Sequence, residues 1–199
     1  MGPQGVPPRR RRFDPERRDR IIDACLQVIG EVGVAGASTR RVAAAADVPL
    51  GSITYHFTDV DELLHEAFAR FSRQVSDRFE QRMAHAASVD DARRAVVDLI
   101  GHDVLVDPRE LVLTHELYTL AARDARYREL THAWMARSRH ALERHFDPTT
   151  ARVLDALIEG LTIHRALDTE PHDEDEVRRA VDAVTRRPPA GGRRAPGTS

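Results

Sequence analysis

The segment "GSITYHF", which begins at Gly51, gathers small and hydrogen-bonding side chains within two helical turns. Hydroxyl, phenol and imidazole groups can hydrogen-bond the edges of nucleic-acid bases or the phosphates beside them. Gly51 and Ser52 would let a backbone approach such a partner closely, and Thr54 could bond a base edge or touch a thymine methyl group. Tyr55 and His56 are long enough to reach flanking phosphates. The types and spacing therefore predict an exposed reading face on duplex DNA.

Such a face needs short helices to hold it out from a core. Ile53 and Phe57 lie four residues apart, so they would point inward from the same helix. Ser38 can cap a preceding short helix, and the joint between the two helices is only the three residues 46–48. An earlier apolar stripe at helical spacing runs from residue 21 to Gly33. Three short helices with a tight joint predict a helix-turn-helix.

The charge of the chain is divided unevenly. Residues 1–58 carry nine arginines against six acidic residues, a net +3, whereas the whole chain has a net charge of -2. This asymmetry favours a polyanion partner for the first part only. No stretch reaches the roughly 18 consecutive apolar residues of a membrane helix, and the first residues lack the apolar region of a secretory signal. We therefore expect a cytoplasmic protein.

Everything that reads as ordered reads as helix, so the predicted fold class is all-α. An Asp59-x-x-Glu62 cap opens a long helix whose apolar stripe persists for about 25 residues, about 40 Å at 1.5 Å per residue. Further helices follow, and Asp-Pro pairs mark several helix starts. The predicted organisation has a disordered basic arm over 1–13, a helix-turn-helix domain over 14–58, a helical ligand-binding and dimerisation domain over 59–186, and a disordered tail over 187–199.

Other reactive side chains suggest no catalytic or metal chemistry. The ten histidines are scattered, with no pair at metal-ligand spacing. His115, Glu116 and Asp103 could form an acid–base set, but nothing supplies a nucleophile or a phosphate cradle. The single cysteine, Cys25, excludes an intramolecular disulfide and falls on an apolar stripe, which favours a buried, inert thiol. We expect no enzyme, no cofactor and no metal.

The stretch "ASTRRVAAAADVPLGSITYHFTDVDELLHEAF", residues 37–68, resembles the DNA-binding domain of the TetR family of bacterial transcriptional regulators. The resemblance is close over about residues 15–68 and much weaker beyond them. It implies an all-helical homodimer that binds a palindromic double-stranded DNA operator and is released, as a repressor, by a small-molecule effector. Mapped onto this chain, it implies DNA contacts at Thr39, Arg40, Leu50, Gly51, Ser52, Thr54, Tyr55 and His56.

The second half offers candidates for the effector and the partner subunit. Tyr118, Tyr127 and Trp134 could line a pocket, although each alone reads as ordinary helix-bundle core. An apolar, close-packing surface resembling the family's four-helix dimer interface is expected at Leu157, Gly160, Leu161 and Val181.

Several residues depart from the family pattern. Asp47 stands where glycine is usual, Pro49 where a serine or threonine cap is usual, Leu50 where a basic residue is common, and Val60 where a lysine often lies. Aspartate tolerates the left-handed backbone of such a turn, but the departures at Pro49, Leu50 and Val60 leave an alternative open, an all-helical small-molecule-binding protein or enzyme that has lost DNA binding.

Overall fold

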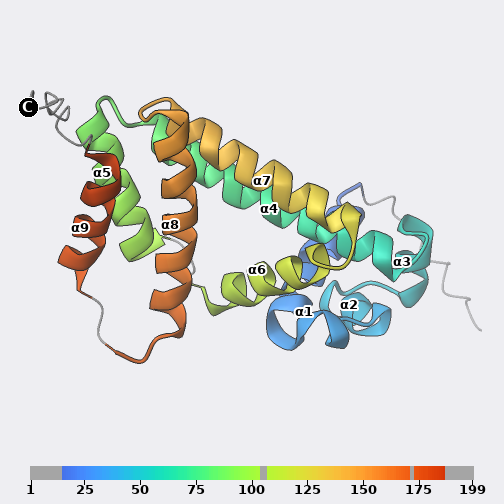
Figure 1. Ribbon diagram of the computed structural model, residues 1–199. Coiled ribbons are helices and arrows are strands. Elements are labelled where there is room, and N and C mark those ends of the chain that lie inside the picture. Colours follow the sequence, from blue (N-terminus) through green and yellow to red (C-terminus); the bar gives the residue numbers. More distant parts are fainter. Residues whose placement is uncertain (1–14, 104–106, 171–172, 187–199) are drawn as a thin grey trace, which may run out of the picture.

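The computed structural model describes residues 15–103, 107–170 and 173–186, and within these ranges every regular element is helical (Figure 1). The predicted all-α class is confirmed, and the predicted arm and tail lie outside the described residues. The elements are α1 (Arg17–Gly36), α2 (Thr39–Ala45), α3 (Leu50–His56), α4 (Val60–Ala84), α5 (Val89–Asp98), the π-helical turn η1 (Leu99–Asp103), α6 (Pro108–Ala121), α7 (Ala125–Glu143), α8 (Pro148–Leu167) and α9 (Glu174–Thr185).

Helix starts are fixed by side chains that accept hydrogen bonds from the first turn. Asp107 and Asp147 precede the prolines that open α6 and α8, and each accepts from backbone N–H groups just inside its helix. Ser88 does the same for α5 through the N–H of Asp91. These caps satisfy donors that a helix leaves unpaired at its start. The Asp-Pro pairs therefore mark helix boundaries as predicted.

The tight joint between α2 and α3 is built as the sequence indicates. The Ser38 hydroxyl caps α2 by accepting from the Arg41 N–H at 3.3 Å. Asp47 has φ 51°, in the left-handed region that aspartate tolerates better than most residues. The chain enters α3 through Pro49, which supplies no side-chain cap. Ile53 and Phe57 are buried, so α3 is anchored from its inner face.

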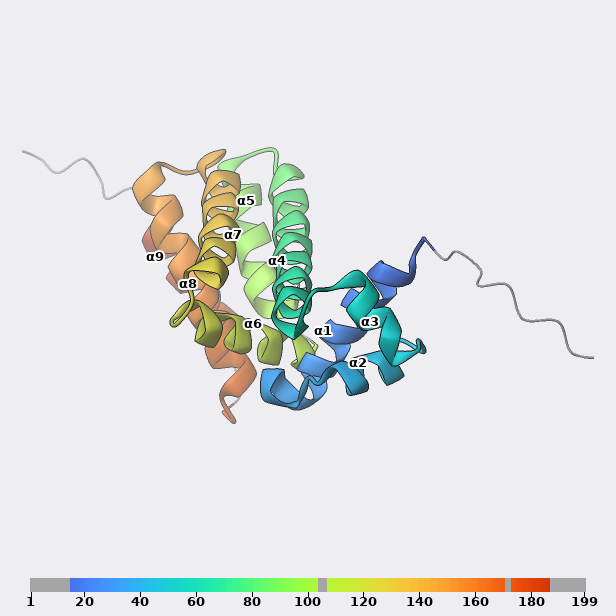
Figure 2. The same ribbon diagram turned by 90° about the vertical axis from the view of Figure 1, so that its right-hand side faces the viewer.

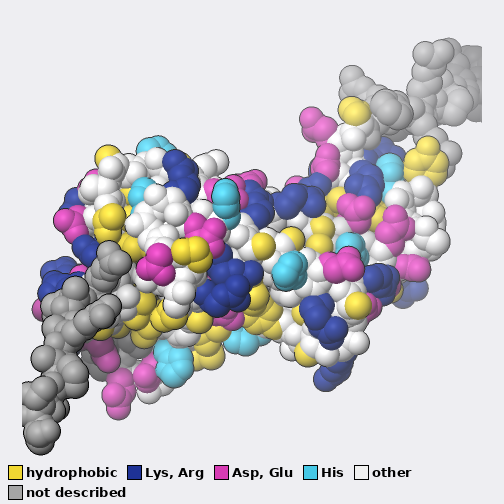
Figure 3. All heavy atoms as spheres, turned by 45° about the horizontal axis from the view of Figure 1, so that its top comes forward, with side chains coloured by type: hydrophobic (Ala, Val, Ile, Leu, Met, Phe, Trp, Pro, Cys, Tyr) yellow, Lys and Arg dark blue, Asp and Glu magenta, His cyan; other side chains and the backbone are white. Residues whose placement is uncertain are grey.

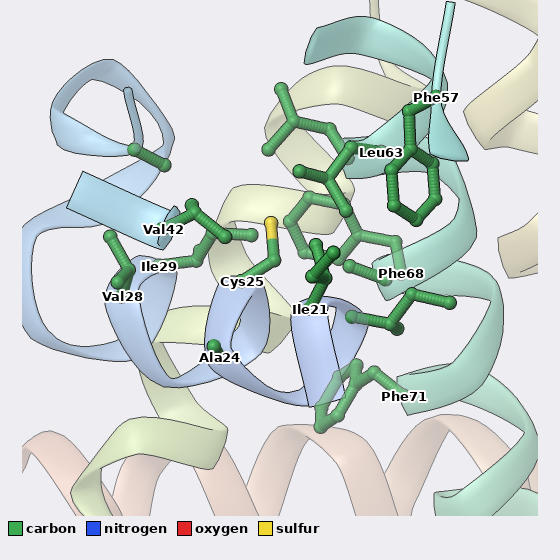
Figure 4. Packing of buried hydrophobic residues seen from close by; sticks show 14 of the residues in the cluster. Ile21, Ala24, Cys25, Val28, Ile29, Val42, Phe57, Leu63, Phe68 and Phe71 are labelled. Atoms are coloured by element: carbon green, nitrogen blue, oxygen red, sulfur yellow. The ribbon is translucent and has the colours of Figure 1, made fainter. Parts of the chain in front are cut away.

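A hydrophobic cluster centred on α1, here called the head cluster, holds the first three helices (Figure 4). Ile21, Cys25 and Ile29 of α1 are fully buried against Val42 of α2 and Phe68 of α4. The cluster does not stop at residue 58. It also takes in residues of α4, α6 and α7, including Leu63, Phe71, Leu113, Leu117, Ala121 and Tyr127.

A second cluster, here called the body cluster, lies at the other end of α4. Phe79 and Met83 of α4 pack there with residues of α5, η1, α7, α8 and α9. Val181 of α9 is fully buried in it, so the prediction that Val181 offers a surface to a partner is wrong. In the sequence, an apolar residue on a short amphipathic helix could pack in the core or contact a partner subunit. In the structure, α9 packs against α5 and α8, and Val181 lies in the core between them.

Helix α4 spans both clusters as one element. Its start carries a reciprocal cap, in which Asp59 accepts from the Glu62 N–H at 2.8 Å and the Glu62 carboxylate accepts from the Thr58 N–H at 2.6 Å. It runs for 25 residues, as the apolar stripe predicts, although Val60 at its start is exposed. Figures 1 and 2 show α4 alongside α7, with α1, α2 and α3 grouped at one end. Among the described residues, no helix combines the length and apolar composition that crossing a bilayer requires.

The burial of Cys25 gives a direct test of this packing. Its side chain is inaccessible, and burial raises the pKa of its thiol to about 12. At about pH 8 such a thiol is ionised to only about one part in ten thousand, and the thiolate is the reactive form. We expect an aromatic disulfide reagent to leave the folded chain unmodified and to label one thiol per chain in guanidinium. Cys25→Ala supplies the blank, and rapid labelling of the folded chain would contradict the packing.

Candidate nucleic-acid interface and ligand pocket

The outer face of α3 is exposed where the sequence predicts a reading face. Tyr55 is 82% exposed and Leu50 is 47% exposed, and Gly51 and Thr54 are exposed beside them. A Cβ atom added at Gly51 would meet nothing within 4 Å, so the helix surface is open there. The Thr54 hydroxyl donates to the Gly51 carbonyl at 3.3 Å. These four residues form one accessible patch at the end of the molecule.

Two other residues of α3 lie differently. Ser52 is buried, with 9% of its surface exposed, whereas the sequence interpretation has it on the outer face. It precedes buried Ile53, and in a seven-residue helix anchored at Ile53 and Phe57 the adjacent position also turns inward. His56 is partly buried, with its ring edge-on to Tyr55 at 4.9 Å between centroids.

The α2 residues give the patch a basic neighbour. Arg40 is exposed and Thr39 is partly buried. The Arg41 guanidinium donates to the Gly36 carbonyl at 2.7 Å, so it ties the end of α1 to α2. The space-filling view shows arginines interspersed with acidic side chains over the face that it displays (Figure 3). The surface drawn there is therefore not uniformly basic, and attraction for phosphate would depend on the positions of individual arginines.

A cavity of about 340 Å³ lies between the head cluster and the body cluster. Phe71 at its wall belongs to the head cluster, and Phe79, Leu99 and Ile158 belong to the body cluster. Its volume falls within the range of small-molecule sites. Its other lining residues come from four helices: Val75, Arg78 and Arg82 of α4; Glu110, Thr114 and Tyr118 of α6; Trp134, Met135 and Ser138 of α7; Asp155, Glu159, Thr162 and Ile163 of α8.

Aromatic rings form one wall of this cavity. Tyr118 and Trp134 stack with centroids 6.1 Å apart, and Phe71 meets Trp134 edge-on at 6.0 Å. Tyr127 does not join them. It lies about two turns before Trp134 on α7, buried in the head cluster, and its hydroxyl donates to an Asp61 carboxylate oxygen at 3.2 Å. The prediction that Tyr127 lines the pocket is therefore wrong. Residue spacing along α7 does not show that the cavity begins only beyond the first turns of that helix.

Carboxylates give the cavity a negative side. Burial raises the pKa of Asp155 to about 6, and Arg139, whose guanidinium lies 3.4 Å away, acts in the opposite direction. Burial and the nearby Glu159 raise the pKa of the Tyr118 phenol. Glu110 is paired with Arg78 at 2.6 Å. The cavity therefore combines stacked rings with partly buried acidic groups, a combination suited to an aromatic cation.

Sequence reasoning missed Phe71, Asp155 and Glu159 as cavity residues. Phe71 reads as one more residue of the α4 stripe. Asp155 and Glu159, however, are acids four residues apart on a helix that is apolar on more than one side, and that spacing puts them on one face. This unusual pattern was available in the sequence. In the parts of the chain that the structure describes, no group of three potential ligand side chains is placed to hold a metal ion.

The structure has a three-helix head in which α3, the second helix of a helix-turn-helix, is exposed. A long helix joins this head to a helical body that contains a cavity. This arrangement defines a class of DNA-binding regulators. Two family models agree with this arrangement. "Bacterial regulatory proteins, tetR family" matches residues 21–67, and "Tetracyclin repressor-like, C-terminal domain" matches residues 86–187. The chain belongs to the TetR family and is a transcriptional regulator of the helix-turn-helix type.

Individual relatives match over most of their length. The crystal structure of SCO7518 from Streptomyces coelicolor A3(2) is 55% identical, with a TM-score of 0.80 over 86% of this chain and 99% of that one. The multidrug binding protein EbrR, solved with ethidium, is 34% identical with a TM-score of 0.71 over 86% and 99%, and it has also been solved with malachite green. The HTH-type transcriptional regulator BetI of Cronobacter sakazakii is 26% identical over 189 residues, 90% of this chain and 94% of the relative.

Proposed function

We propose that this protein is a cytoplasmic repressor that binds a palindromic operator as a homodimer and is released by a small molecule. The observation that carries this proposal is the position of the cavity. It is lined by α4, α6 and α7, and all three helices also contribute to the head cluster that holds α3. A molecule that favours a different spacing of these helices must favour a different pose of the head.

The proposed DNA contacts follow from exposure. Leu50, Gly51 and Thr54 face outward on α3 and would meet base edges in the major groove, while Tyr55 and Arg40 would reach the backbone. Ser52 faces inward, so we assign it to holding α3 against the head. Thr39 and His56, both partly buried, would contact phosphates at the margin.

The cavity chemistry favours an aromatic cation as effector. Stacked Tyr118 and Trp134 offer ring faces, and Asp155 and Glu159 offer negative charge in a partly desolvated setting. Cations gain most from aromatic faces where water is excluded. EbrR, a relative at 34% identity, has been solved with the aromatic cation ethidium, which supports the same ligand class here.

The proposed dimer surface lies on α8. Val153 is 46% exposed and Leu167 is 61% exposed, and a Cβ atom added at Gly160 would meet nothing within 4 Å. Leu157 and Leu161 are partly buried against the body cluster and present their remaining surface nearby. An apolar face with an open glycine allows a second helix to approach closely.

From the positions proposed for the DNA contacts, the effector and the dimer surface, we assign residues 14–58 to DNA binding and 59–186 to ligand binding and dimerisation.

The first test concerns α3. Selection from a random DNA library with the wild-type chain should return a palindrome with two half-sites about one helical turn apart. Thr54→Ala should change preference at one base pair by about 1–3 kcal/mol, because it removes a contact to a base. Arg40→Ala should weaken binding to every sequence and reduce the salt dependence by about one ion, because it removes a phosphate contact.

Both variants are measured by fluorescence anisotropy at several salt concentrations, with Glu31→Ala as the control on an exposed position of α1. Failure of the wild-type chain to enrich any sequence would favour the alternative, a helical ligand-binding protein that no longer binds DNA.

The second test uses ethidium, whose charge does not change between about pH 5 and pH 8. Asp155 has a pKa of about 6 in the free protein, and a bound cation would lower it. Ethidium affinity should therefore be highest above pH 6 and fall as the pH drops through 6, approaching tenfold per unit at the lower end. Asp155→Asn should bind more weakly at pH 7.5 and lose this pH dependence. An affinity that is independent of pH in the wild-type chain would contradict the assignment.

The third test concerns the dimer. Gly160→Arg adds a long, charged side chain where the single chain has open space, so the fold should survive. Light scattering should give the wild-type protein twice the 22.3 kDa chain mass and the variant a single chain mass. Ala136→Arg on the exposed side of α7 supplies a control with the same added charge. A Gly160→Arg protein that stays dimeric would place the interface elsewhere.

A further inference from the structure

Helix α1 is interrupted near its end, and a distant carboxylate occupies the interruption. Gly33 has φ 71° and ψ 172°, outside the helical region. The N–H of Val34, the next residue, donates to a Glu116 carboxylate oxygen of α6 at 3.1 Å, across 82 positions of sequence. This contact is part-buried, so water competes with it only weakly.

The approach of α6 to α1 leaves no space for a side chain at two glycines of α1. A Cβ atom at Gly33 would lie 2.5 Å from the same Glu116 oxygen, and a Cβ atom at Gly30 would lie 2.9 Å from the Arg109 Cβ. Arg109 and Glu116 are seven residues apart, so they share one face of α6. Glycine suits position 33 for two reasons: it adopts a positive φ without a steric penalty, and it has no Cβ atom to collide with the Glu116 carboxylate.

The neighbouring face of α6 lines the cavity. Glu110, Thr114 and Tyr118 recur every four residues along it, whereas Glu116 is not among the lining residues. A shift or rotation of α6 that suits a ligand would therefore move Glu116 relative to Val34. The hydrogen bond has a narrow range of favourable distance and angle, so it responds to displacements that apolar packing tolerates.

The other end of this contact leads directly to the helix-turn-helix. Val34 lies five residues before Thr39, the first residue of α2. Within that interval the Gly36 carbonyl accepts from the Arg41 guanidinium, and the Ser38 hydroxyl accepts from the Arg41 N–H. The end of α1 is thus bonded to α2 on one side and to α6 on the other.

We propose that Glu116 is the positioning residue that couples the cavity to the DNA-binding head, through its hydrogen bond to the Val34 N–H at the Gly33 break. The inference rests on the proposed function, in which cavity occupancy controls operator affinity. In the described conformation the bond fixes the end of α1, and with it α2. When α6 moves, the bond is lost and the head is released from its pose.

The experiment measures a coupling factor, the ratio of operator dissociation constants with and without saturating malachite green at one fixed pH. This propeller-shaped aromatic cation cannot stack between base pairs as a flat dye does. In the wild-type chain the factor should lie between about 5 and 150, the usual range for coupled sites. Glu116→Ala should bring it close to 1 by weakening operator binding in the absence of dye, and the free variant should bind dye at least as tightly as the wild type, because dye no longer has to break the bond. Glu116→Gln keeps an acceptor oxygen and should retain most of the coupling.

Two further variants separate coupling from general damage. Thr119→Ala, at an exposed position of the same helix, should behave as wild type. Gly33→Ala should displace the carboxylate and lower the coupling factor, but in the Glu116→Ala background it should lower it no further. Circular dichroism melts establish that each variant is folded at the assay temperature.

The outcomes distinguish the inference from the proposed function. A wild-type chain that binds both operator and dye without coupling contradicts the proposed function itself, and so does a chain that binds neither. A coupled wild type with an equally coupled Glu116→Ala variant overturns the role of Glu116 and leaves the repressor proposal standing. Equal loss in Thr119→Ala also overturns it, because the effect would then belong to α6 as a whole.

Discussion

The constraint on which the structure depends is that one continuous helix, α4, is packed into two separate hydrophobic clusters. Leu63 and Phe71 are buried with α1 at one end, and Phe79 and Met83 are buried with α5 and α8 at the other. Interiors of proteins are close-packed and transmit strain, so a rigid helix shared in this way cannot move at one end alone. The cavity lies between the two clusters, where a ligand would act on both.

The same arrangement explains why the head and the body are not independent. Leu113 and Leu117 of α6 complete the head cluster, while Thr114 and Tyr118 of the same helix line the cavity. Each of these two turns of α6 therefore places one residue in the cluster that holds the DNA-binding helices and the next residue in the wall of the cavity. A regulator needs such shared elements, because a ligand shifts an equilibrium only through contacts that differ between its two states.

Local patterns predicted most of the fold, because caps and apolar spacing act over a few residues. The Asp59 and Glu62 cap, the length of α4 and the left-handed Asp47 follow from residue type and neighbours alone. The exposed Tyr55 and the buried Phe57 follow from their places on a helix. Long-range placement could not be predicted in this way. Ser52, Tyr127 and Val181 each fit two environments, and only the packing of distant helices decided between them. The contact between Glu116 and Val34 joins residues 82 positions apart and has no local signal.

The central claim is that ligand in the cavity and operator at the head favour opposite members of one pair of conformations. Measuring the effect of each ligand on the affinity of the other tests this claim. Calorimetry would give the malachite green affinity of the wild-type protein alone and with saturating operator, beside a DNA duplex of scrambled sequence as control. The account predicts that operator weakens dye binding by the same factor by which dye weakens operator binding, because coupling free energies are reciprocal. Dye affinity that is unchanged by operator, in a protein that binds both tightly, would contradict it.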